Sequence, residues 1–347
     1  MTFKTQSHEV PAGHDGHGGG PGKLIAALVV VPVFVGVLIA LFAWPQANLE
    51  PRGLPIGLAG PDAATAPIEA ELAHSPDAMD IHRYADADEA RQAIEDRDVY
   101  GAFVASPDGV ELMTASAASP AVAAALTELA SSGQTAGTPP VTVTDVVPAD
   151  PDDPRGAAFA SGVLPLLIAG IIIGVLCATS TRPGLRQMGA LIGISALAGL
   201  AAVAVTQGWL GVIEGDWLAN AGVLGLLVLA VAALVAGSVA LLGMPGIGLA
   251  AVIVVLLGNP WSGVATAPEL LPTPVGDIGQ LLPPGAGGNA LRSTAFFDGT
   301  GVGGHLAVLI AWAALGMAGI ALGSRKARRA ARPEPAGSGA EGVYAGT

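Results

Sequence analysis

The chain has 347 residues, of which 52% are hydrophobic and 12% are charged, about half the charged fraction of a typical soluble domain. A single cysteine, Cys177, excludes an intramolecular disulfide and every metal or cluster site that needs several cysteines. The net charge of −13 gives no basic footprint for nucleic acid, and apolar stretches about 20 residues long indicate an integral membrane protein instead.

The first apolar stretch, residues 24–43, predicts a transmembrane helix. It is longer than the apolar core of a signal peptide, about 7–15 residues, and no clear cleavage pattern follows it, so we expect a signal anchor. Residues 1–23 are rich in Gly and are typical of a disordered cytoplasmic tail. His8, His14 and His17 offer metal-binding chemistry there, but the composition favours a tail without metal.

Residues 44–156 carry most of the charge of the chain. They contain 19 acidic and 5 basic residues, a net charge of −14, so the rest of the chain carries +1. Short apolar stretches alternate with helical patterns, which predicts an α/β domain inserted between the first two transmembrane helices. Asp86 and Ser119 are expected helix N-caps. The expected strands are 53–60, 79–84, 99–106, 109–116 and 139–148, and the expected helices are 62–75, 86–97 and 119–132.

Five more apolar stretches follow and form a membrane domain at 157–323. None contains a charged residue, and about 20 helical residues cross the hydrocarbon core of a bilayer. Together with 24–43 they predict an α-helical integral membrane protein with six transmembrane helices, although 244–258 is short for a full span. The five stretches are 157–178, 187–207, 218–242, 244–258 and 306–323.

The basic residues predict how these helices are oriented. Outside 44–156 the chain has ten Lys and Arg residues, and nine of them flank the same side if the N-terminus is cytoplasmic. We therefore expect a multi-pass protein of the plasma membrane with both termini cytoplasmic. A basic cytoplasmic tail would follow at 324–347, and residues 44–156 would be extracellular.

The stretch 280–297 lies before the last apolar segment and differs from it in composition. Its Pro-Pro-Gly sequence would turn the chain, and residues 290–297 could form two helical turns. In one interpretation it is a re-entrant or interfacial element, with the Phe pair at the membrane surface and the Arg toward lipid head groups. The alternative is an ordinary extracellular loop, and periodicity does not distinguish the two. The candidate residues are Pro283, Pro284, Gly285, Asn289, Arg292, Phe296 and Phe297.

Motifs for catalysis or for an internal energy source are missing from the sequence. There is no G-x-S-x-G, and the acidic residues of 44–156 cluster on solvated helix faces, so we do not expect an enzyme. The Gly-rich stretch before Lys23 has His17 and Leu24 where a phosphate-binding loop needs Gly and Ser or Thr. The apolar stretches hold no ionisable group for ion coupling. Transport would need an energy source outside this chain, and no cofactor or metal is expected.

Four stretches carry a family resemblance: "VYGAFVASPDGVELM", "VTDVVPADPDDPRGAAF", "GNPWSGVATAPELLP" and "QLLPPGAGGNALRSTAFFDG". The layout is one span, a large outer domain and five spans with a basic tail. Together these features resemble the type-2 ABC transporter permease superfamily, most of all its YhgE/phage-infection-protein-like branch. The resemblance covers about residues 20–325.

The resemblance implies the permease subunit of an exporter of an unknown envelope substrate. Such a subunit is usually a homodimer in contact with membrane lipids, driven by a separate ATPase on the cytoplasmic face. The resemblance also implies that 280–297 belongs to the export path, and Arg182 and Arg186 become the candidate inner-loop contacts of the ATPase. The inner loops "TSTRPGLR" and "GMPG" are too short for a coupling helix. That leaves an alternative, a phage-infection-protein-like or secretion-associated scaffold or receptor of the cell envelope without transport activity.

Overall fold

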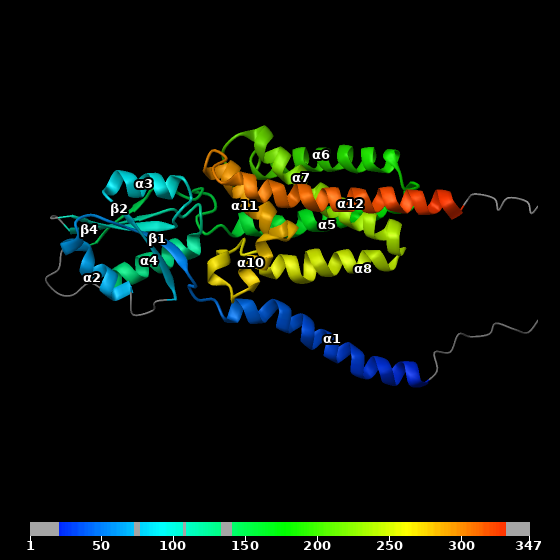
Figure 1. Ribbon diagram of the computed structural model, residues 1–347, viewed down its shortest axis with the longest axis horizontal. Helices are drawn as coiled ribbons and strands as arrows, with labels where there is room; N and C mark the ends of the chain where they lie inside the picture. Colours follow the sequence, from blue (N-terminus) through cyan, green and yellow to red (C-terminus); the bar gives the residue numbers. More distant parts are fainter. Residues whose placement is uncertain (1–20, 73–76, 107–108, 133–140, 331–347) are drawn as a thin grey trace, which may run out of the picture.

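The structure is a computed structural model that describes residues 21–72, 77–106, 109–132 and 141–330. It consists of a bundle of long helices and a smaller α/β domain, which lies at one end of the bundle (Figure 1). The start of α1 (Pro21–Ala47) and the end of α12 (Val302–Ala330) both lie at the opposite end. The three N-terminal histidines and most of the two predicted tails lie outside the described residues.

Within the described residues, the α/β domain has a sheet with the strand order β2-β1-β3-β4-β5. β1 pairs in parallel with β2 and β3, β4 is antiparallel to β3, and β5 is parallel to β4. The parallel strands are joined through α2, α3 and α4, because parallel neighbours need a crossover longer than a hairpin. The bounds are β1 (Leu54–Ala59), α2 (Asp62–Leu72), β2 (Met79–Tyr84), α3 (Ala87–Glu95), β3 (Gly101–Ser106), β4 (Gly109–Thr114), α4 (Pro120–Ser132) and β5 (Thr142–Asp145).

The order of these elements agrees with the prediction from the sequence, and both expected helix caps are present. The Asp86 side chain accepts hydrogen bonds from the N–H groups of Asp88 (3.1 Å) and Glu89 (3.0 Å). Ser119 Oγ accepts from the N–H of Val122 at 3.2 Å. These caps pair N–H groups that the first turn of a helix leaves without an intrahelical partner.

Different helices cover the two faces of the sheet (Figure 1). On one face, Ile94 of α3 packs in a buried cluster with Met113 of β4. On the other face, Leu126 of α4 packs with Leu112 of β4 and Leu58 of β1. The domain therefore has one apolar layer on each side of its sheet.

Among the described residues, five helices are long and apolar enough to cross a membrane. Several present large apolar side chains on their outer surfaces, among them Phe34, Ile172 and Leu315. A soluble protein would bury such a surface, so these helices indicate a membrane protein. They are α1, α5 (Ala157–Ser180), α6 (Leu185–Thr206), α7 (Trp217–Leu242) and α12.

The predicted span 244–258, the fifth along the chain, corresponds to a shorter apolar helix, Pro245–Trp261. It consists of α8 (Pro245–Ala251), a π-helical segment η1 (Val252–Gly258) and α9 (Asn259–Trp261). Asn259 and Pro260 extend it beyond the predicted stretch 244–258. Its 17 residues span about 25 Å at 1.5 Å per residue, less than the hydrocarbon core of a typical bilayer.

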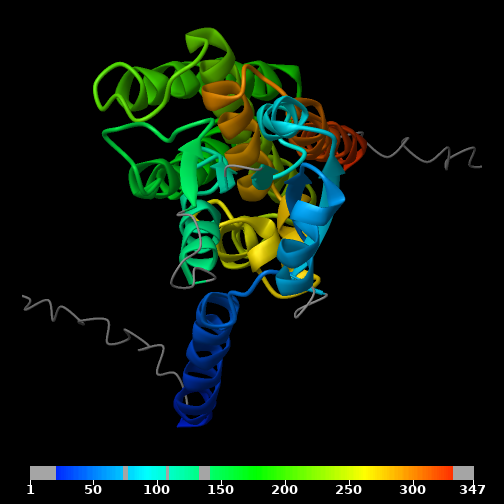
Figure 2. The same cartoon turned by 90° about the vertical axis from the view of Figure 1, so that its left-hand side faces the viewer.

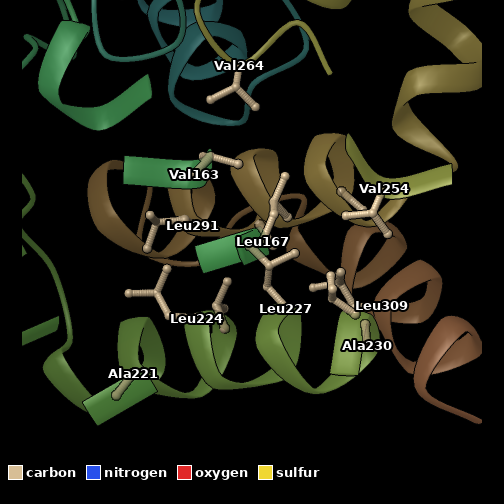
Figure 3. Close-up of a cluster of buried hydrophobic side chains, with 14 of the residues drawn as sticks. Val163, Leu167, Ala221, Leu224, Leu227, Ala230, Val254, Val264, Leu291 and Leu309 are labelled. Carbon is tan, nitrogen blue, oxygen red and sulfur yellow. The ribbon is translucent and has the colours of Figure 1, made fainter. Parts of the chain in front are cut away.

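Helix α7 lies at the centre of the bundle, and its neighbours approach it closely through glycine. A Cβ atom at Gly174 of α5 would lie 2.7 Å from the carbonyl oxygen of Ala232 on α7. Leu224 and Leu227 of α7 fill the space toward α5 and α11 (Figure 3). The small-residue pattern that begins at Gly189 on α6 has no such neighbour, since a Cβ there would meet no atom within 4 Å.

The segment between the apolar helix Pro245–Trp261 and α12 contains three short helices: η2 (Pro268–Leu270), α10 (Val275–Gln280) and α11 (Pro283–Phe296). In both views α11 runs across the direction of the long helices, near the α/β domain (Figures 1 and 2). α1 stands apart from the bundle in both views and is almost entirely exposed.

Candidate functional site

The stretch 280–297 forms a longer and more deeply buried helix than the sequence predicts. α11 has Pro283 and Pro284 in its first turn, where a missing N–H costs no helical hydrogen bond. These prolines begin the helix, so the predicted turn ahead of a two-turn helix at 290–297 is wrong. The helix is buried from Pro283 to Ala295, which also excludes an ordinary loop.

The first turn of α11 fits tightly between α10 and η1. A Cβ atom at Gly285 would overlap the carbonyl oxygen of Gly279 at the end of α10. A Cβ at Gly258 of η1 would lie 2.8 Å from Cγ of Pro284. These contacts fix where α11 begins relative to the apolar helix Pro245–Trp261.

Arg292 points into the protein, contrary to the expectation that it lies toward lipid head groups. Its side chain is 4% exposed and donates hydrogen bonds to the carbonyl oxygen of Val264 (2.9 Å) and to Asn289 Oδ1 (3.2 Å). Its Cζ lies 4.9 Å from the ring centroid of Phe159 on α5, a cation–π contact. The inward orientation follows because the interior supplies the acceptors that a buried guanidinium needs.

Arg97, which follows α3 in the α/β domain, meets Arg292 at Asn289. Arg97 Nη2 donates to Asn289 Oδ1 (3.2 Å), and Nη1 donates to the backbone oxygen of Asn289 (3.3 Å) and to Ser293 Oγ. One amide oxygen therefore accepts from two guanidinium groups. Asn289 joins the α/β domain to the bundle through charge-assisted hydrogen bonds, which are stronger than neutral ones.

Phe296 and Phe297 pack inside the protein, whereas one of the two interpretations of the sequence places them at the membrane surface. Phe297 is 5% exposed and belongs to the buried cluster on the α3 side of the sheet. Arg97 Cζ lies 5.1 Å from the centroid of its ring. Phe296 is partly buried, with its ring 6.2 Å from that of Phe159. The end of α11 is thus part of the interface with the α/β domain.

The backbone at Arg97 has a conformation that usually selects glycine. Its φ of 65° lies in the left-handed region, and its N–H donates to the carbonyl oxygen of Ile94. The N–H of Asp98 donates to the carbonyl oxygen of Ala93, which completes a Schellman-type end to α3. A non-glycine residue at this position costs about 1–2 kcal/mol, and the contacts of the Arg97 side chain offset that cost.

The polar contacts continue from α11 to its neighbours in the bundle. Asn289 Nδ2 donates to Gln280 Oε1 at 2.6 Å, and Gln280 Nε2 donates to the carbonyl oxygen of Ser262 at 2.9 Å. Thr294 Oγ1 donates to Oδ1 of the fully buried Asn220 on α7 at 2.7 Å. α11 is thus bound by side-chain hydrogen bonds on two sides.

In the inner part of the junction two arginines, Arg97 and Arg292, lie near one carboxylate, that of Glu269. Tyr100 donates its hydroxyl proton to Glu269 Oε2 at 2.8 Å, and burial raises the pKa of Tyr100. Burial lowers the pKa of Arg97, and burial together with Arg97 lowers the pKa of Arg292 to about 10. Neither arginine forms an ion pair with any residue in the described ranges.

A cavity of about 450 Å³ opens at this junction. Its walls include Arg97 and Tyr100 from the α/β domain, Glu269 from η2 and Asn289 from α11. The volume is in the range of pockets that bind small molecules. The arrangement can bind and orient a polar ligand, and no group of three or more described His, Cys, Asp or Glu side chains could hold a metal ion.

Arg97, Tyr100 and Glu269 were not candidates from the sequence. Arg97 was the last residue of the expected helix 86–97, and no local sequence pattern links it to Asn289, which is 192 residues away. The one available signal is an arginine where the end of a helix usually has glycine. Sequence reasoning therefore identified the α11 side of the junction and missed the α/β side.

Arg182 and Arg186 lie at the other end of the bundle and take no part in this site. Both are exposed, on and beside the loop between α5 and α6. That loop comprises residues 181–184, and the loop between α7 and α8 comprises residues 243–244.

Comparison of the chain with family models, with curated proteins and with solved structures finds no match.

Proposed function

We propose that the chain is the membrane permease subunit of a type-2 ABC exporter-like system that moves an unknown envelope substrate. The observation that supports this most is the buried polar helix α11 beside the cavity. Its Asn289 and Arg292 are nearly inaccessible to solvent, at 5% and 4% exposure. Buried ionisable groups in membrane proteins are costly and tend to mark sites and paths for polar substrates.

In this proposal the α/β domain is extracellular and covers the outer end of the path. The start of α1, the end of α12, Arg182 and Arg186 are cytoplasmic. All of them lie at the end of the bundle away from the α/β domain (Figure 1). A separate ATPase would bind there, because the apolar cores of the helices offer no ionisable group for ion coupling.

The proposal also includes a homodimer embedded in lipid. Gly189 and Gly193 lie on α6, and a Cβ atom at either would meet nothing within 4 Å. Two small residues four positions apart let a second helix approach closely. This open face of α6 is available to a second copy.

A specific observation favours a second candidate, a scaffold or receptor of the cell envelope that moves no substrate. The loops 181–184 and 243–244 are the connections between described helices at the end away from the α/β domain. Neither can hold a helix for an ATPase to grip. A scaffold needs no such helix and would present the α/β domain to its partners.

A pull-down of the tagged full chain in mild detergent, with mass spectrometry and an ATPase assay, tests the proposal. An exporter predicts a stoichiometric nucleotide-binding subunit and ATP turnover. Changing Arg182 and Arg186 to Glu should release that subunit. Arg325→Glu is the matched control, since Arg325 is also exposed near the same end of the bundle, on α12.

Recovery of cell-wall or secretion proteins without any nucleotide-binding subunit would contradict the exporter and favour the scaffold. Equal release of the subunit by Arg325→Glu would show only a general dependence on charge. It would contradict the specific role that we propose for Arg182 and Arg186.

A further inference from the structure

We propose that the cavity at the junction binds a small zwitterion, with its acid group at Arg97 and its ammonium group at the carboxylates of the cavity rim. This inference concerns binding alone, and it holds whether or not the chain moves a substrate.

The inner wall of the cavity has an excess of positive charge. Arg97 lines it, and Arg292 lies behind Asn289, to whose Oδ1 both arginines donate. Glu269, which accepts the Tyr100 hydroxyl, is the carboxylate whose charge acts on both arginines. The buried Arg292 and the half-buried Arg97 thus meet one carboxylate at the inner wall, and an acid group of a ligand would balance the second positive charge.

Arg97 keeps donors for such a group. Its hydrogen bonds use Nη1 and Nη2, and its Nε–H has no acceptor within the described part of the chain. A guanidinium has five N–H donors, arranged to match carboxylate or phosphate oxygens. The contacts to Asn289 hold the group in place without using all of its donors.

The rim of the cavity has the opposite charge. Asp96, Asp98 and Asp277 line it, and all three are exposed to solvent. Asp98 and Asp277 form no ion pair with a described residue. The other arginine of the lining, Arg52, pairs with Glu50, so it offsets little of the rim charge.

This polarity selects among ligand classes. A simple anion would be repelled by the acidic rim, and a simple cation would meet Arg97 at the inner wall. A molecule with an acid group and an ammonium group a few bonds apart satisfies both. Amino acids, short peptides and phosphoethanolamine have this chemistry and fit a volume of about 450 Å³.

The same chemistry has two sources, a free zwitterion or the head group of an ethanolamine phospholipid. His305 also lines the cavity and lies near the start of α12, a helix long and apolar enough to cross a membrane, so part of the wall belongs to such a helix. The experiment therefore needs a soluble arm and a lipid arm.

In the soluble arm, calorimetry measures binding of O-phosphoethanolamine and glycylglycine to the full chain in detergent, with inorganic phosphate and ethanolamine as single-charge probes. In the lipid arm, the chain is reconstituted in mixed phosphatidylethanolamine and phosphatidylglycerol nanodiscs. Native mass spectrometry then identifies the lipid that stays bound. We expect at least one zwitterionic probe or phosphatidylethanolamine to bind more tightly than either single-charge probe.

Variants test the two ends of the site. Arg97→Gln should weaken binding by about 10- to 100-fold, the loss expected for hydrogen bonds to a charged group. The double change Asp98→Asn and Asp277→Asn should weaken the zwitterion and strengthen inorganic phosphate. Arg83→Gln is the control, because Arg83 lies on the edge strand β2 and does not line the cavity.

Thermal unfolding of each variant shows whether it is folded. If Arg97→Gln does not fold, the two exposed aspartates still test the inference. Phosphate or ethanolamine binding as tightly as the zwitterions would overturn it. So would the lack of any binding in both arms, or the same loss in Arg83→Gln as in the rim variant.

Discussion

The core around α7 and the junction around α11 are both buried, but they are built differently. At the core, apolar side chains and glycines bring helices together, as at Gly174 and Ala232. At the junction, a helix is held by Asn289, Arg292 and Thr294 through hydrogen bonds. Stability of the core should therefore depend mainly on the volume of the substituted side chain. Stability of the junction should depend on both the volume and the hydrogen-bonding groups of the side chain.

The two regions also contribute differently to the fold, the core mainly to its stability and the junction mainly to the orientation of the α/β domain on the bundle. Apolar packing places helices at a short distance but allows them to slide, while each hydrogen bond at the junction needs a donor and an acceptor in a defined direction. The junction therefore determines how the α/β domain sits on the bundle. Substitutions in the two regions should differ in size and in kind.

The largest effect is expected for Arg292→Glu. The new carboxylate would face the carbonyl oxygen of Val264 and the ring of Phe159, neither of which can donate to it. We expect a loss of about 3–5 kcal/mol in the free energy of unfolding, measured by denaturant titration in detergent. Arg292→Lys keeps the charge and should lose about 1 kcal/mol. Equal losses in the two variants would contradict a dependence on charge.

The core is tested by Gly174→Leu, which adds volume where no space exists. A Cβ atom at Gly174 would lie 2.7 Å from the Ala232 carbonyl oxygen and from Cβ of Val235, closer than real side chains approach. Separating α5 from α7 should cost about 3 kcal/mol. Gly162→Leu is the control on the same helix, because a Cβ there meets no atom within 4 Å. If both variants unfold alike, close packing at Gly174 is not the cause.

A smaller difference should distinguish Arg97→Gly from Arg97→Ala. Both lose the contacts with Asn289, Ser293 and Phe297. Glycine also removes the strain of the positive φ, so Arg97→Gly should be more stable than Arg97→Ala by about 1–2 kcal/mol. Thermal unfolding of the two purified variants measures this difference. Equal stabilities of the two variants would contradict the cost that we assign to the positive φ at this position.

Much of the core follows from periodicity and composition. The five long apolar helices and the order of strands and helices in the α/β domain were predicted, because each depends on residues close in sequence. The caps at Asp86 and Ser119 were predicted for the same reason. An apolar helix was also predicted at 244–258, and the structure has one at Pro245–Trp261, which ends three residues beyond the predicted stretch.

The junction could be predicted only in part. The sequence identified Asn289 and Arg292 as candidates, and the interfacial interpretation turned Arg292 outward because a charge near a membrane usually turns toward water. The acceptors that turn it inward, Asn289 Oδ1 and the carbonyl oxygen of Val264, depend on tertiary structure. Arg97 belongs to the α/β domain, and no local sequence pattern predicts where that domain lies relative to α11.

The smallest effect is expected at the edge of the junction, for Tyr100→Phe. The change removes the hydrogen bond to Glu269 and should cost about 1 kcal/mol at pH 7. Burial, with the charge of Glu269, raises the pKa of Tyr100 above its ordinary value of 10.0, so the folded state holds this proton more tightly than the unfolded state. The contribution of Tyr100 is therefore complete below pH 10 and is lost as the pH rises above it. Unfolding followed from pH 8 to 11 should show the wild-type chain losing its advantage over Tyr100→Phe above pH 10. A constant difference over that range would mean that the hydroxyl is as exposed to solvent in the folded chain as in the unfolded one.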